Sequence, residues 1–282
     1  MAVKIITDSA SDISQAEAKQ WGIQVLPLRT IFGQEEFLDG VTIDHQQFFQ
    51  KLIESDTLPT TSQLSPYEYE EAFQAARTAG DEVLCITLSS KLSGCCQSAR
   101  IASDAVPAVV VDSENVCVGQ RILVELAVRL RNAGKSAREI GAILERERAN
   151  IRVIALLDTL EYLKKGGRIS PAAALAGSLL SIKPVVAVER GEIAILGKAR
   201  GSKNGNNMLM DLIRKCGGIN FEKPYCLAYS GLSDALLQKY IADSAALYAA
   251  QTERLPISTI GSTIGTHVGP GAIVVAFFAK ET

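Results

Sequence analysis

The first half of the chain repeats one pattern: a short apolar run, then a loop containing Ser or Asp, then a segment with helical periodicity. The four runs are Val3–Thr7, Val83–Leu88, Ala108–Val111 and Ile151–Leu156. Strand, loop and helix in this order make a βαβ unit, whose parallel sheet is covered by helices on both faces. We therefore predict an α/β fold with a parallel sheet, in which ligands meet the loops at the carboxyl ends of the strands.

The helical segments between these runs are marked by start signals. Ser14 and Glu17 have the spacing of a capping box, in which each satisfies the other's backbone amide. The other expected helices cover Pro66–Arg77, the segment from Ser93-Gly94 to Ala102, Val118–Asn132 and Leu160–Lys165.

The sequence pattern changes after Gly166-Gly167. A hairpin is expected around Gly191, between Ile182–Val188 and Ile193–Leu196, because a Gly turn separates two apolar runs. Further strands are expected at Tyr225–Tyr229, Ile257–Ile260 and Ala272–Phe278, with a helix over Ser233–Ala250. At roughly 100–200 residues per domain, 282 residues indicate about two domains. We predict a Rossmann-like α/β domain over 1–157, a mixed α+β domain over 158–282, and a ligand site between them.

Charge and composition exclude several classes of protein. The net charge is −2 and no basic run is present, so nucleic acid is not an expected partner. Two histidines leave little room for a His-rich metal site, and no metal or cofactor is expected. The six cysteines have no C-x-x-C spacing, so we interpret them as reduced thiols of a cytoplasmic protein. No apolar leader precedes Asp8, and the glycine-rich stretch 255–279 reads as paired strands rather than as a membrane helix.

The common catalytic and nucleotide-binding motifs are incomplete. Gly134-Lys135-Ser136 lacks the first glycine of a P-loop, and Gly269-Pro270-Gly271 does not complete G-x-G-x-x-G. Gly261–Gly265 has Thr263 at the nucleophile position of a G-x-S-x-G motif, and we expect no strand-to-helix transition around it. Covalent, metal-dependent and nucleotide chemistry therefore lack their usual signatures.

Three groups of neutral hydrogen-bond donors remain as candidates for a binding site. Thr61 and Ser62 precede an expected helix, Ser93-Gly94 follows an expected strand, and His267 lies among dense glycines. Each group has a structural alternative, either as a helix cap or as a hydrogen-bonded core histidine. Neutral donors with no evident nucleophile–base pair favour recognition of an anionic head group, and an apolar ligand tail would explain the low polarity elsewhere.

Two further features leave alternatives open. The basic cluster Lys164–Arg168 has two interpretations. Its cations stabilise the C-terminal end of a helix that ends before Gly166, or they form a docking surface or phosphate contact for a partner. Cys95-Cys96 lies near a helix start, where the pKa of a thiol can fall, although packing within the core is the favoured interpretation.

Taken in order along the chain, these residues resemble the DegV family of bacterial fatty-acid-binding proteins. Each motif is weak alone, but the ordered set is specific and spans the chain. The matching segments are Thr7–Asp12, Thr61–Gln63, Leu88–Gly94 with Gln97–Ala99, Val111–Ser113, Leu160–Ser170, Ile182–Pro184 and Gly265–Gly271.

The resemblance implies a two-domain DegV-like fold that holds one long-chain fatty acid in a tunnel and is not itself an enzyme. By position, Thr61 and Ser93 would hold the carboxylate, aided by Ser62, the Gly94 backbone and His267. A separate ATP-dependent kinase subunit would phosphorylate the carboxylate, and the acyl phosphate would pass to phospholipid synthesis, with transient contact at the membrane surface. Arg168 would lie on the surface and face the kinase or its phosphate.

Two departures from the family pattern concern the tunnel. Cys95-Cys96 stands where the family commonly has Thr-Tyr, and Leu64 stands where Pro is frequent. Because the two cysteines could line the tunnel, chain-length and unsaturation preferences are not transferred. The rival hypothesis is an esterase or acyltransferase that uses Ser93 and His267, which requires the two side chains to meet.

Overall fold

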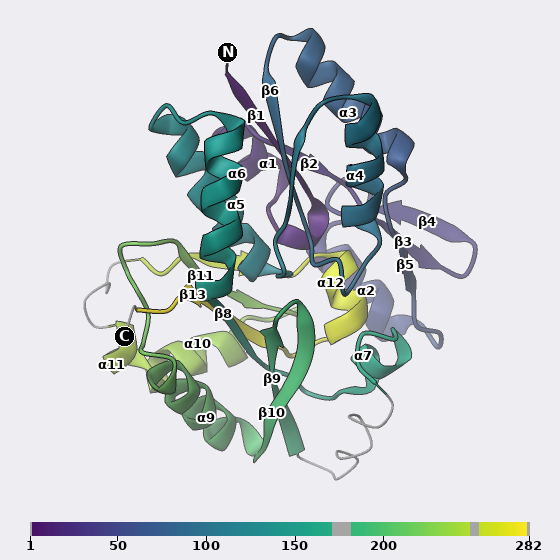
Figure 1. Ribbon diagram of the computed structural model, residues 1–282. Coiled ribbons are helices and arrows are strands. Elements are labelled where there is room, and N and C mark those ends of the chain that lie inside the picture. The colour runs from purple at the N-terminus through teal and green to yellow at the C-terminus, as the bar shows by residue number, and fades with distance from the viewer. Residues whose placement is uncertain (1, 171–181, 249–253, 281–282) are drawn as a thin grey trace.

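The computed structural model describes residues 2–170, 182–248 and 254–280, which form three sheets surrounded by helices (Figure 1). The strands are β1 (Val3–Asp8), β2 (Gln24–Leu26), β3 (Arg29–Phe32), β4 (Glu35–Leu38), β5 (Thr60–Ser62), β6 (Glu82–Thr87), β7 (Val109–Asp112), β8 (Ile151–Leu156), β9 (Ile182–Glu189), β10 (Glu192–Arg200), β11 (Tyr225–Tyr229), β12 (Ile257–Thr259) and β13 (Ile273–Phe278). The helices are α1 (Gln15–Trp21), α2 (His45–Glu54), α3 (Pro66–Thr78), α4 (Cys95–Ala105), α5 (Val118–Asn132), α6 (Ala137–Glu147), α7 (Glu161–Lys165), α9 (Gly201–Lys215), α10 (Ala235–Asp243), α11 (Ala245–Tyr248) and α12 (Ser262–Val268), with 3-10 turns at Ser9–Ser11 and Arg148–Asn150.

The first sheet is parallel throughout, with the order β2-β1-β6-β7. This arrangement confirms the predicted α/β fold class. The prediction that Ile151–Leu156 continues the same sheet is wrong, because β8 pairs antiparallel with β9 and β13. An apolar run buried on both faces fits the interior of either kind of sheet, so its composition does not reveal its neighbours.

The second sheet is mixed, with the order β10-β9-β8-β13-β11-β12. It begins at Ile151, ahead of the boundary predicted at 157. The predicted hairpin is confirmed as β9 and β10 joined at Arg190-Gly191. The predicted helix over Ser233–Ala250 is divided into α10 and α11, and its last two positions lie outside the described residues.

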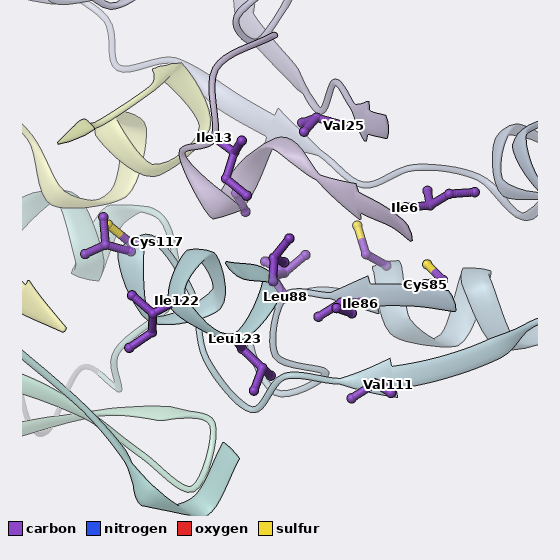
Figure 2. Packing of buried hydrophobic residues seen from close by; sticks show 14 of the residues in the cluster. Ile6, Ile13, Val25, Cys85, Ile86, Leu88, Val111, Cys117, Ile122 and Leu123 are labelled. Carbon is purple, nitrogen blue, oxygen red and sulfur yellow. The ribbon is translucent and has the colours of Figure 1, made fainter. Parts of the chain in front are cut away.

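The two larger sheets share one helix and one hydrophobic core. Helix α5 packs against β1 of the parallel sheet and against β8, β11 and β13 of the mixed sheet. In β8, Val153 and Ala155 join the core on the α5 side, whereas Ile154 and Leu156 join a second core on the opposite face. Figure 2 shows Cys117 and Ile122 of the α5 region in the same cluster as Ile6 and Ile86 of the parallel strands. The shared core fixes the parallel and mixed sheets relative to each other.

A third, small sheet and helix α12 complete the region between the larger sheets. Strands β3, β4 and β5 pair antiparallel, and α12 packs against β3, α2 and α7 (Figure 1). No strand-to-helix transition was expected near Gly261, but β12 ends at Thr259 and α12 begins at Ser262. Within α12, Gly265 allows close packing, because a Cβ there would lie 2.9 Å from Phe49 Cζ. The strands predicted at Ile257–Ile260 and Ala272–Phe278 are confirmed as β12 and β13, and the glycine-containing segment between them forms α12, which was not predicted.

Candidate functional site

A cavity of about 320 Å³ opens where the three sheets meet. Its lining comes from loops after β6 and β7, from β5 and β10, and from α7 and α12. In the parallel sheet β2 lies on one side of β1 and β6 on the other, so the strand order reverses between β1 and β6. The loop after β6 lies at the carboxyl end of this pair of strands. This position is where open α/β sheets bind ligands. The lining residues are Leu28, Thr61, Ser62, Gln63, Leu88, Leu92, Ser93, Val116, Leu163, Arg168, Ile193, Thr263, Ile264, His267 and Val268.

Five of the six predicted site residues line this cavity: Thr61, Ser62, Ser93, Arg168 and His267. The sixth, Gly94, lies next to it as the residue before α4. A Cβ at Gly94 would lie 2.7 Å from Gln63 Cδ, so the missing side chain makes room for Gln63 beside the cavity.

Thr61 and His267 form a polar pair within the cavity. Thr61 Oγ1 lies 2.9 Å from His267 Nε2, which joins β5 to α12 across 206 positions of sequence. Burial and the nearby Arg168 guanidinium lower the pKa of His267 from 6.5 to about 4. The imidazole is therefore neutral near pH 7, so its two nitrogens differ in whether they carry hydrogen.

Ser93 is half-buried and keeps its hydroxyl close to the start of α4. Its Oγ lies 3.4 Å from Cys95 Sγ, which is a weak acceptor, and 3.4 Å from the Cys95 amide nitrogen, which is a long distance for an N–H···O hydrogen bond. Ser62 Oγ makes a similarly long contact of 3.4 Å with the Gln63 carbonyl oxygen. Both hydroxyls are thus weakly held and free to turn toward a stronger acceptor in the cavity.

Arg168 was expected on the surface, but it is half-buried and lines the cavity. Its Nε donates to the Leu92 carbonyl at 3.1 Å, and a terminal nitrogen donates to the Gly166 carbonyl at 2.7 Å. These two carbonyl acceptors hold the guanidinium against the cavity wall. Burial lowers the pKa of Arg168 from its ordinary value, but an arginine stays protonated in proteins.

The opposite part of the cavity is apolar and extends inward. A smaller space of about 50 Å³ shares Val116, Leu163, Ile193, Ile264 and Val268 with the main cavity. Its remaining lining consists of aliphatic side chains and one thiol: Cys117, Val153, Ala155, Leu157, Val186, Ala187, Val188 and Val274. The site therefore has a polar end and an apolar interior.

Buried carboxylates from the Thr7–Asp12 motif hold two elements of the site. Asp8 Oδ2 accepts a hydrogen bond of 2.9 Å from the Leu88 amide, at the start of the loop that carries Ser93. Asp12 Oδ1 accepts one of 2.8 Å from the Gly261 amide, immediately before α12. Asp39 accepts from the Ser262 amide at 2.8 Å, so two carboxyl groups hold the N-terminus of the helix that carries His267.

The cysteines pack in the core and do not form a reactive site. All six lie in the described part of the chain and are free thiols, and only Cys216 is partly exposed. Cys95 and Cys96 are not among the residues that line either part of the cavity, so they do not shape the tunnel as considered above. Burial raises the pKa of Cys95 to about 11 and also raises that of Cys96. The core-packing interpretation is confirmed.

This burial predicts slow thiol chemistry in the native protein. Because the thiolate is the reactive form, we expect about one thiol per chain, Cys216, to react rapidly with a disulfide reagent at pH 8. All six should react after unfolding. Rapid native labelling of Cys95 or Cys96, identified by peptide mass spectrometry, would contradict this assignment.

Several lining residues were not predicted from the sequence. They are the apolar Leu28, Val116, Ile193 and Ile264, and also Thr263, which occupies the buried start of α12. Thr263 and His267 are four residues apart, as are Ile264 and Val268, which is the spacing of one helix face. Reading 262–268 as a helix would have revealed this signal.

The geometry of the polar end bears on the esterase hypothesis. His267 Nε2 is paired with Thr61, and Nδ1 is buried without a partner among the described residues. Among the described residues that line the cavity there is no Asp or Glu that could orient the histidine as a base. Ser93 and His267 share the cavity, but the hydrogen bond of His267 goes to Thr61.

The described residues also bear on metals and membranes. They contain no group of three or more His, Cys, Asp and Glu side chains arranged to hold a metal ion. Within the same ranges, no helix has the length and apolar character needed to cross a bilayer. His45 joins loops instead: its ring nitrogens lie 2.7 and 2.8 Å from the Ile260 and Gly231 carbonyl oxygens.

An α/β fold of three sheets, around a cavity with hydrogen-bond donors at one end and an apolar interior, is typical of proteins that bind small molecules. A family model described as the DegV family of uncharacterised proteins matches residues 2–280. The chain belongs to the DegV family.

Relatives cover the chain from end to end. A DegV domain-containing protein of Caldanaerobacter subterraneus subsp. tengcongensis is 35% identical over 99% of both chains. A solved DegV family protein from Thermus thermophilus, described as fatty-acid binding, has a TM-score of 0.88 and 31% identity, covering 99% of this chain and 100% of that one. A stearic-acid-binding protein from Eubacterium ventriosum has a TM-score of 0.86 and 25% identity, covering 98% and 97%.

Proposed function

We propose that this protein binds one long-chain fatty acid, with the acyl chain in the apolar cavity and the carboxylate at Thr61, Ser93 and His267. The observation that carries the proposal is the Thr61–His267 pair at one end of an otherwise mainly aliphatic cavity. A fatty acid has the same distribution of polarity. The fatty-acid-binding relatives support the same ligand class.

The proposed head-group contact uses the neutral state of His267. A carboxylate offers only acceptors, so the protein must supply hydrogens. With its hydrogen on Nε2, His267 donates to Thr61 Oγ1 and leaves the hydrogen of the Thr61 hydroxyl free for the carboxylate. Ser93 supplies a second hydroxyl, and Ser62 and the Gly94 amide are further donors at the same end.

Arg168 supplies the compensating charge. Its guanidinium lines the cavity and is close enough to His267 to lower the pKa of the imidazole. A positive charge at this position stabilises a bound carboxylate, because burying an unpaired anion is costly. The same charge is available to a phosphate group transferred to that carboxylate.

The proposed role in the cell is that of a carrier that needs no cofactor. Thr61, Ser93 and Arg168 are each half-buried, whereas Val153, Ala155 and Leu157 in the inner part are buried. The head group therefore lies at the accessible end, where a separate ATP-dependent kinase subunit reaches it. The resulting acyl phosphate passes to phospholipid synthesis.

The ligand itself is testable by extraction and titration. Protein purified from a bacterial host should yield about one fatty acid per chain in an organic extract analysed by mass spectrometry. Delipidated protein should regain palmitate or oleate on titration. An extract without lipid, together with no binding of either acid, would refute the proposal.

Removal of the Ser93 hydroxyl tests the carboxylate position. We expect Ser93→Ala to weaken fatty-acid binding by about 1–3 kcal/mol, because a donor to a charged acceptor is lost. Isothermal titration with palmitate gives the difference. An unchanged affinity would remove Ser93 from the head-group site.

A further inference from the structure

Helices α7 and α12 interlock through two rings and two glycines. Helix α7 contributes the ring of Tyr162 and is followed by Gly166, and α12 contributes the ring of His267 and is followed by Gly269. Each glycine faces the ring of the other helix. The contact is therefore reciprocal.

The first half of the interlock places His267 against Gly166. A Cβ at Gly166 would overlap His267 Nδ1, would lie 2.9 Å from Cε1, and would lie 3.0 Å from the Tyr162 carbonyl oxygen. Gly166 has a φ of −74°, which any residue adopts, so backbone conformation does not require glycine here. Glycine is required because the His267 ring occupies the space in which a Cβ would lie.

The second half places Tyr162 against Gly269. A Cβ at Gly269 would overlap the Tyr162 ring and lie 2.9 Å from its Cγ. Tyr162 also packs against the hydrophobic cluster that includes Phe48 and Phe49 of α2. The ring of Tyr162 thus ties the end of α12 to both α7 and α2.

The interlock matters because both helices are short. Helix α7 spans five residues and α12 spans seven, lengths at which helices do not hold their position without tertiary contacts. Asp12 and Asp39 fix the N-terminus of α12, but His267 lies in its last turn. The His267 ring is held by its hydrogen bond to Thr61 and by its packing against Gly166.

We infer that Gly166 and Tyr162 are positioning residues, which hold the His267 ring where Nε2 meets Thr61 and thereby set the affinity for the carboxylate. The inference rests on the proposed fatty-acid site. The same segment also places Arg168, because the Gly166 carbonyl accepts a hydrogen bond from its guanidinium. One short loop therefore orients both the histidine and the arginine of the polar end.

The test follows His267 directly by NMR. The chain has two histidines, so a comparison with His267→Ala assigns both imidazoles. In the unaltered protein His267 should titrate near pH 4. In Gly166→Ala the displaced ring should titrate closer to 6.5, and palmitate should bind about 10-fold more weakly. In a protein that already carries His267→Ala, the further change Gly166→Ala should weaken palmitate binding less than 2-fold, because the ring that it would displace is absent.

Two control variants separate positioning from general damage. Gly205→Ala creates a comparable overlap with Leu156 in the other core, and Gly167→Ala strains the same loop at a φ of +70° with open space around its Cβ. Both should keep the low titration of His267. If Gly166→Ala does not fold, Tyr162→Leu should produce the same change in His267 to a smaller extent.

The outcomes distinguish this inference from the fatty-acid proposal. An unchanged His267 titration in both Gly166→Ala and Tyr162→Leu would overturn the positioning role, whatever the ligand. A shifted titration in a protein that binds no fatty acid would support the positioning of the ring and refute the proposed ligand. Equal losses of palmitate affinity for Gly166→Ala in the presence and absence of His267 would also overturn the inference.

Discussion

Replacing Thr61 with Val is expected to weaken fatty-acid binding about 100-fold, because a hydrogen bond to a charged acceptor contributes about 1.5–3 kcal/mol and each 1.4 kcal/mol is tenfold. Val has nearly the shape of Thr and suits strand β5, so packing changes little. The loss also leaves His267 Nε2 without its 2.9 Å partner. Titration with palmitate, compared with the unaltered protein, gives the change in Kd.

A neighbouring threonine provides the matched control. Thr60 precedes Thr61 in β5, is exposed, and is not among the residues that line the cavity. Thr60→Val should therefore bind palmitate with unchanged affinity. Similar affinities for Thr60→Val and Thr61→Val would show that the Thr61 hydroxyl does not contact the carboxylate.

Replacing Asp12 with Asn is expected to remove a loss of stability that the unaltered protein shows as the pH rises to 8. Burial raises the pKa of Asp12 from 3.8 to about 8, partly offset by the Gly261 amide and reinforced by the charge of Asp39. The folded state therefore binds a proton that the unfolded state releases, and stability is lost as pH rises from about 4 through 8. For one proton the slope is at most about 1.4 kcal/mol per pH unit. Asn does not ionise, and its Oδ1 still accepts from Gly261.

The effect of Asp12 on the free energy of unfolding is best separated from the effects of Asp8 and His267 between pH 6.5 and 8. Burial also raises the pKa of Asp8, to about 6, so its effect on stability is mostly complete below this window. His267 acts in the opposite sense, because its lowered pKa costs stability as pH falls from 6.5 to about 4. Urea unfolding should show stability falling with pH in the unaltered protein and in Asp8→Asn, and falling much less in Asp12→Asn, in which only the buried thiols still contribute near pH 8. A parallel decline in all three would exclude Asp12 as its source.

Elements with strong local signals were predicted closely. Helix α5 spans the predicted Val118–Asn132, and the Ser14–Glu17 capping box begins α1. Apolar periodicity and capping act over a few neighbouring residues, so the sequence displays them directly. The three- and four-residue strands β2 to β5 were not predicted, because such short segments carry little periodicity.

Elements defined by distant partners were predicted poorly. The sheet to which β8 belongs depends on its pairing with β9 and β13, and the run Ile151–Leu156 contains no residue pattern that identifies these partners. Helix α12 was missed because its glycines resemble turn residues. Gly261 and Gly269 flank this helix, and Gly265 lies inside it where the Phe48 and Phe49 side chains leave no room for a Cβ.

The sequence by itself determined the fold class, the polar groups at Thr61, Ser93, Arg168 and His267, and their DegV pattern. Those conclusions depend on residue type and order, which the chain carries explicitly. Tertiary structure alone decided that Thr61 pairs with His267, that Arg168 is held in the cavity wall, and that Cys95 and Cys96 pack outside the cavity. These features depend on contacts between segments up to about 200 residues apart, which exist only after the sheets have packed on their shared helix.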